Sequence, residues 1–115
     1  MSQSGRVLQN AGTLSTASLL TTVLAGSGAL TLVQESEIVL LNTTAASTVA
    51  LPAASNVGKR VSFIGNSIVG NCVITPSTFV GHSTATITAT GQAVTLVYTG
   101  SAGWAMLSNN GATIA

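Results

Sequence analysis

The sequence has 115 residues, no aspartate, a single cysteine and very little charge. Charged residues make up 4% of the chain, against about 25% in an average soluble protein. The charges are those of Arg6, Lys59, Arg60, Glu35 and Glu37. Because Lys and Arg do not cluster along one face, the sequence lacks the footprint of a nucleic-acid-binding protein, and we expect no nucleic acid as partner. Either glutamate could form a salt bridge with Lys59 or Arg60, within or between subunits.

One cysteine excludes an intrachain disulfide and a cysteine-based metal cluster. Cys72 is followed by the strand-like run Val73–Thr75. The pattern predicts a small buried apolar side chain in a strand, and the alternative is a reactive or intersubunit thiol. We expect neither a metal nor a cofactor.

Residues 7–34 include a long uncharged stretch after Arg6, which faintly resembles a signal peptide. Gln9, Asn10 and many Thr, Ser and Gly residues make it too polar for a membrane-spanning helix. We therefore expect no membrane partner.

The residue types for catalysis are nearly absent. With one histidine and no aspartate, a Ser-His-Asp triad cannot form, and only a glutamate could orient His82. We interpret Gly81–Ser83 as a turn with an exposed or hydrogen-bonded histidine. Glu35 and Glu37 have a spacing that could suit a glycosidase pair, but with 3% aromatic residues the chain offers little to hold a sugar. We expect no enzyme and no catalytic residues.

Two further residues have a functional and a structural interpretation. Trp104 could stack on a sugar, but its place at the start of a predicted strand favours core packing. Asn42–Thr44 fits a glycosylation sequon, and we interpret it as a strand end.

Apolar residues are abundant, at 46%, and the remainder is rich in Thr, Ser, Asn and 12 Gly. Such a chain folds, because a disordered one would be poor in apolar residues and rich in charge. A surface with so little charge is tolerated when other subunits cover much of it. The composition therefore favours a homo-oligomer, and the alternative is a sparsely charged monomeric extracellular β domain.

The chain divides into two parts. Residues 1–28 show no clear period and end in the glycine-rich joint Ala25–Gly28, which predicts an N-terminal arm. Residues 29–115 alternate short runs of Val, Ile, Thr and Leu with Gly, Asn, Pro and Ser, which predicts an all-β domain. The expected strands are Leu30–Val33, Glu37–Asn42, Thr48–Leu51, Arg60–Gly65, Asn71–Thr75, Thr84–Thr90, Ala93–Thr99 and Trp104–Ser108.

Strand patterning and turns agree on an antiparallel β-sandwich or barrel-like domain. In Thr84–Thr90, small apolar residues alternate with threonines, which predicts one buried and one solvated face. Gly91–Gln92 and Gly100–Gly103 are predicted hairpin turns. Pro52 and Pro76 fall at the ends of expected strands, where a missing amide proton does no harm.

The order of several short motifs resembles a module of tailed-phage tail fibres and virion decoration proteins. The motifs are Leu51–Ser55, Gly58–Val61, Phe63–Ile64, Asn71–Pro76, Gly81, Thr84–Thr90, Gly91–Val97 and Gly103–Trp104. The resemblance covers about two-thirds of the chain. It implies an all-β, usually trimeric virion component without an active site.

A chain this short has no fibre shaft, so we expect a capsid decoration or cement protein on the virion surface rather than a fibre. Its partners would be two further copies of itself and the major capsid protein or another virion protein, with residues 1–28 as anchor. The alternative is a tail-fibre or head-fibre adhesin that binds a host-surface glycan through the loops around Gly81–Ser83 and Gly100–Gly103.

Overall fold

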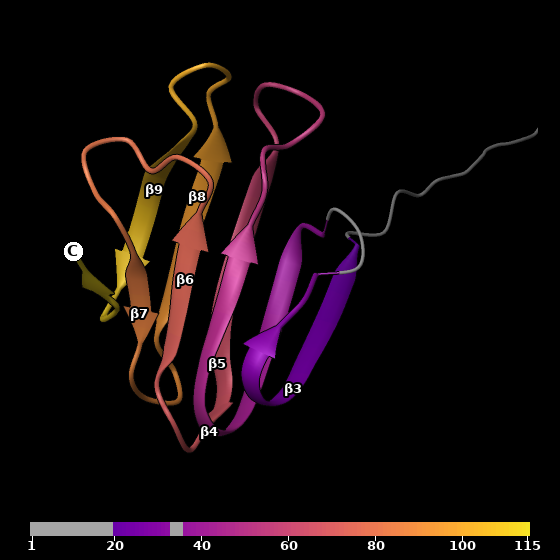
Figure 1. Cartoon of the computed structure of the whole chain (residues 1–115), viewed down its shortest axis with the longest axis vertical. Coiled ribbons are helices and arrows are strands. Elements are labelled where there is room, and N and C mark those ends of the chain that lie inside the picture. The colour runs from indigo at the N-terminus through magenta and orange to yellow at the C-terminus, as the bar shows by residue number, and fades with distance from the viewer. Residues whose placement is uncertain (1–19, 33–35) are drawn as a thin grey trace, which may run out of the picture.

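A computed structural model describes residues 20–32 and 36–115, and every helix or strand assigned in these ranges is a β-strand. The strands are β3 (Thr21–Leu30), β4 (Ile38–Leu51), β5 (Arg60–Ile68), β6 (Cys72–Pro76), β7 (Ala85–Ile87), β8 (Ala93–Tyr98), β9 (Trp104–Asn110) and β10 (Thr113–Ile114). They belong to one sheet, which curls into a half-barrel (Figure 1). The predicted all-β class is confirmed.

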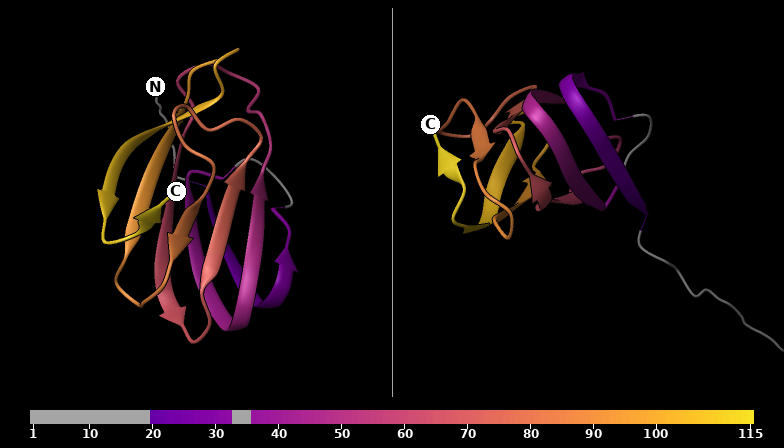
Figure 2. Two further views of the ribbon diagram at one scale, coloured as in Figure 1. Left: turned by 60° about the vertical axis from the view of Figure 1, so that its left-hand side comes forward. Right: turned by 90° about the horizontal axis from the view of Figure 1, so that it is seen from below.

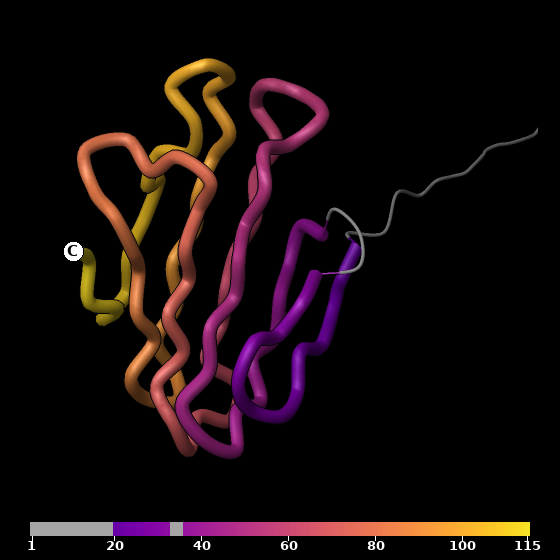
Figure 3. Tube along the Cα trace, in the orientation of Figure 1, coloured from indigo at the N-terminus to yellow at the C-terminus, as the bar shows by residue number. Residues whose placement is uncertain are grey.

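The sheet curls because its longest strand, β4, turns a corner. Residues 38–43 of β4 pair with β5, whereas residues 47–51 pair with β6. β3 follows β4 around the same corner, and its register shifts between Gly26 and Gly28. Both glycines have positive φ, of 116° and 75°, a conformation that glycine adopts without steric cost. Figure 3 shows both bends at the lower end of the molecule.

The corner divides the sheet into two halves. The β5–β8–β9 half also contains residues 21–26 of β3 and 38–43 of β4, and the β6–β7–β10 half contains residues 28–30 and 47–51. Seen from below, the sheet wraps around an interior (Figure 2, right).

Strand direction differs between the start and the end of the chain. β3 pairs with β4, and β4 with both β5 and β6, in parallel, whereas the remaining strand pairs are antiparallel. Two parallel neighbours must be joined by a long connection that returns to the starting end of the sheet. Between residues 38–43 of β4 and β5, residues 47–51 in the other half make this connection. The predicted antiparallel arrangement was therefore wrong for the pairs β3–β4, β4–β5 and β4–β6.

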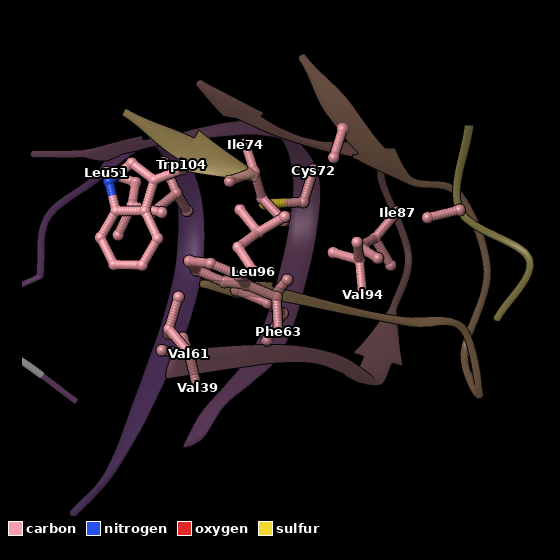
Figure 4. Close-up of a cluster of buried hydrophobic side chains, with 14 of the residues drawn as sticks. Val39, Leu51, Val61, Phe63, Cys72, Ile74, Ile87, Val94, Leu96 and Trp104 are labelled. Carbon is pink, nitrogen blue, oxygen red and sulfur yellow. The ribbon is translucent and has the colours of Figure 1, made fainter. Parts of the chain in front are cut away.

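The core lies between the two halves (Figure 4). Alternate residues of each strand point into it, so that side chains from β4, β5 and β8 meet those from β6 and β7. The fully buried members include Val39, Leu41, Val49, Phe63, Ile74, Ile87 and Leu96. One continuous apolar cluster therefore holds the halves together.

The N-terminal boundary differs from the prediction. The arm was expected over residues 1–28, but Thr21–Gly28 belong to β3 and pair with β4. The strand expected at Leu30–Val33 is also wrong, because β3 ends at Leu30. The glycines interpreted as a flexible joint form a corner within the sheet. Residues 1–19 of the predicted arm lie outside the described residues.

The two strands expected at Glu37–Asn42 and Thr48–Leu51 are wrong as separate strands, because β4 runs through both, and the remaining five expected strands are present with shifted ends. The largest shift affects Thr84–Thr90, of which only Ala85–Ile87 form a strand. The side chain of Gln92 explains this, because its Oε1 accepts hydrogen bonds from the backbone N–H groups of Thr88 (2.7 Å) and Ala89 (3.3 Å). These bonds make a turn where the strand was expected to continue. The predicted alternation holds within β7, where Ala85 and Ile87 are buried.

Candidate functional site

Three loops gather at one end of the half-barrel, drawn at the top in Figure 1. They are residues 52–59, 77–84 and 99–103, and they include both segments predicted as adhesin loops. Gly100–Gly103 forms the expected turn, in which the N–H of Gly103 donates to the carbonyl of Gly100 at 2.8 Å. These loops are the first candidate for a binding site.

Trp104 joins the three loops from beneath. Its indole Nε1 donates to the carbonyl of Pro52 at 3.1 Å, and its ring lies 5.3 Å from that of Tyr98. Its backbone N–H donates to Thr78, and its carbonyl accepts from Val80. The residue is only 2% exposed, so the core interpretation is confirmed and a sugar cannot stack on the indole.

His82 lies in the predicted turn and is exposed. Its backbone N–H donates to the carbonyl of Phe79 at 3.1 Å, and the two rings are 5.1 Å apart. The expectation of an exposed or hydrogen-bonded turn histidine is confirmed.

The loop end offers no aromatic platform. Of the four aromatic residues of the chain, Phe63, Phe79 and Trp104 are buried, and Tyr98 is half-buried. The large apolar side chains exposed at the loop end are aliphatic: Val57 is 73% exposed and Val80 is 43% exposed. Flat aromatic rings are a common contact for sugars, and no Phe, Tyr or Trp ring is fully exposed at the described loop end.

Of the two glutamates in the glycosidase interpretation, the structure describes Glu37. Glu37 is half-buried just before β4, with its backbone bonded to Leu20 and Ser62, and Glu35 lies outside the described residues. Glu37 forms no ion pair with Lys59 or Arg60, so the predicted salt bridge is absent for this glutamate within the subunit. In residues 20–32 and 36–115, no three His, Cys, Asp or Glu side chains gather as metal ligands. The same ranges contain no helix able to cross a membrane.

Cys72 lies in β6 with no exposed surface. The prediction of a buried apolar-like side chain is confirmed, and the alternative of an accessible thiol is excluded. Desolvation by burial raises the pKa of this thiol to about 11.

We expect Cys72 to resist thiol reagents in the folded protein. At pH 8, a thiol with a pKa of 11 is ionised in only about one molecule in a thousand, and the thiolate is the reactive form. An aromatic disulfide reagent should therefore label one thiol per chain in 8 M urea and none within an hour without urea. Complete labelling of the native protein within minutes would contradict this.

The most general property of the described surface is its lack of charge. Glu37, Lys59 and Arg60 are the charged side chains in the described ranges. Large apolar side chains are exposed at several places: Leu20, Val23, Val57, Val69, Val80, Met106 and Leu107. In addition, a shallow groove of about 300 Å³ lies between the ends of β3 and β4, lined mainly by Leu30, Leu32, Ala50 and Pro52.

No protein-family model matches the sequence, and no curated protein is significantly similar to it. Function therefore has to be argued from the surface described above and from the motif resemblance.

Proposed function

We propose that the chain is a structural protein of a virion surface, a capsid decoration or cement protein that works as a homotrimer. The observation that carries the proposal is the surface with three charged side chains and seven exposed large apolar ones in the described residues. Monomers in solution rely on charge to stay apart, and exposed apolar patches mark interaction sites. A surface of this kind suits a homo-oligomer in which other subunits cover much of each chain.

The virion assignment is supported by the motif resemblance. Its segments have structural roles that a repeated module would keep: Asn71–Pro76 largely coincides with β6, and Gly103–Trp104 closes the last hairpin over the core. The adhesin alternative receives less support, because the large apolar side chains exposed at the loop end are the aliphatic Val57 and Val80, and the exposed ring in the named loops is the imidazole of His82.

Sedimentation of the purified chain tests the trimer. At about 10 µM the protein should sediment at about 34 kDa, three times the 11.4 kDa of the chain, since a specific interface commonly has a Kd at or below the micromolar range. A monomer at this concentration would contradict the proposal and would favour a general extracellular β domain.

Binding to particles tests the location. Virus particles stripped of the protein should take up the purified trimer to a fixed stoichiometry and withstand heating better afterwards. Removal of residues 2–19, which precede β3, should abolish uptake and leave the trimer intact. Saturable binding to host cells, without binding to particles, would favour the adhesin instead.

A further inference from the structure

The outer face of the β5–β8–β9 half carries a line of apolar side chains across four strands. Val23 of β3 is opposite Leu40 of β4, Leu40 is opposite Ile64 of β5, and Ile64 is opposite Ala93 of β8. We call these four residues the outer row. Aligned partners on neighbouring strands are in direct contact, so the outer row forms one continuous stripe across the sheet.

The outer row points away from the core. Its members alternate along their strands with the buried residues Leu24, Val39, Leu41, Phe63 and Val94. Val23 is 55% exposed, and Leu40, Ile64 and Ala93 are half-buried. β4 is therefore apolar on both faces, a pattern typical of parallel strands that are covered on both sides.

Two hydroxyls in the row beside the outer row are paired with each other. In the next row, Ile38 is opposite Ser62, and Ser62 is opposite Thr95. The hydroxyls of Ser62 and Thr95 are hydrogen-bonded to each other at 2.8 Å. Burying this pair would not leave an orphaned hydroxyl, which is the main cost of covering a polar group. The outer row and this hydroxyl pair can therefore lose their water at little cost.

The outer row begins at β3, which is an edge strand among the described strands. β3 pairs with β4 on one side, and no other described strand pairs with it. Its ten residues include neither a charge nor a proline, the features with which proteins protect exposed edges from strand addition. Four strands about 4.8 Å apart and six residues long present about 400 Å², whereas a stable interface needs about 800 Å² per partner. The contact must therefore extend over the edge of β3.

The opposite end of the same half supplies a matching surface. A ring of three subunits needs two different surfaces on each subunit, because a contact between identical surfaces closes at two. At the far edge of the half, β9 exposes Met106 (38%) and Leu107 (51%) and has no charged residue. The outer row and the β9 edge are both apolar and uncharged and suit each other, whereas the charged Arg60 lies on the same face four residues from Ile64.

We propose that the outer row and the edge of β3 in one copy dock against β9 of the next copy, head to tail around the trimer. This inference rests on the proposed homotrimer and assigns its interface. The occupant of the outer row is thus a second copy of this chain.

Lysine substitutions in the full-length chain test the assignment. Val23→Lys and Leu107→Lys each place a charge at an exposed position, which spares the fold but buries the charge in the contact. Each variant should weaken self-association by about 100-fold or more and sediment as a monomer. Thr75→Lys is the matched control, because Thr75 is exposed on β6 in the other half, and it should remain trimeric. Circular dichroism and urea unfolding of every variant show whether the fold is kept.

Mixing the two variants distinguishes a head-to-tail contact from any other. Val23→Lys keeps an intact β9 and Leu107→Lys keeps an intact outer row, so a 1:1 mixture at about 100 µM should form a dimer through one restored contact. A mixture that stays monomeric overturns the proposal. The proposal is also overturned if Val23→Lys remains a trimer. If that trimeric variant in addition no longer binds particles, the outer row is assigned to the contact with the capsid. A wild-type monomer would instead refute the homotrimer itself.

Discussion

Replacement of Trp104 by alanine should destabilise the fold by about 3–5 kcal/mol, the usual range for truncation of a buried tryptophan. Since domains of this size are stable by only about 5–15 kcal/mol, a large share of the protein would be unfolded under mild conditions. The effect is measured by urea unfolding at equal protein concentration, followed by far-UV circular dichroism because Trp104 is the only tryptophan.

The effect is large because the indole of Trp104 is both buried and hydrogen-bonded. The indole fills the core beneath the loops, and its N–H satisfies the carbonyl of Pro52. Alanine would leave a cavity and also an unpaired carbonyl, and these costs add. Trp104→Phe gives the hydrogen bond more weight, because the phenyl ring keeps most of the indole volume and has no N–H. It should cost about 1–2 kcal/mol.

Val69→Ala is the control. Val69 is 77% exposed and lies outside the proposed contact between subunits, so its truncation should cost less than about 0.5 kcal/mol. A Trp104→Ala variant that loses less than about 1 kcal/mol would contradict the assignment of the indole to the core.

Much of the fold could be predicted from short-range patterns. Alternation of apolar and polar residues located most strands, and it correctly placed Ala85 and Ile87 on the buried face. Glycine spacing located the hairpin at Gly100–Gly103. Such patterns report which face of a strand is buried, and they depend only on neighbours in the sequence.

Strand partners were not predictable in the same way. The parallel pairing of β3, β4 and β5 depends on contacts between residues far apart in the sequence. Gly26 and Gly28 were interpreted as a joint because a glycine in a corner and a glycine in a linker look alike in sequence. The structure distinguishes them through the register on both sides of the bend.

The outer row was missed for the same reason. Val23, Leu40, Ile64 and Ala93 lie on four strands, and each segment contributes only one residue to the outer row. One signal was available: Ile38–Leu41 is apolar at four consecutive positions, which indicates a strand covered on both faces. That signal predicts a covered strand but not what covers it.

Gly70→Ala should destabilise the fold by about 3 kcal/mol or more, the upper range for a substitution that overfills a packed site. A Cβ on Gly70 would lie 2.5 Å from the carbonyl oxygen of Ala45, and closer still to the adjoining backbone atoms of Ala45 and Ala46. All of these are backbone atoms, so no flexible side chain could move aside to make room for the Cβ. Urea unfolding at equal protein concentration measures the loss.

The contact at Gly70 holds two successive corners of the chain together. The hydroxyl of Thr43 donates to the carbonyl of Gly70 at 2.6 Å, and it accepts from the N–H of Gly70 at 3.3 Å. Thr43 is 1% exposed, so a displaced Gly70 would leave a buried hydroxyl without its partners. Steric overlap and the broken hydrogen bonds therefore act in the same direction.

Gly28→Ala is the matched control at a neighbouring corner, because it changes conformational freedom without crowding. Gly28 has a φ of 75° and no atom within 4 Å of an added Cβ, so the variant should lose only about 1–2 kcal/mol from backbone strain. Gly70 is not among the glycines with positive φ, so the loss in Gly70→Ala would come from steric overlap and the broken hydrogen bonds and not from backbone strain. Equal losses in the two variants would mean that the β4 corner and the β5–β6 corner do not touch as described, and that the core alone holds the two halves together.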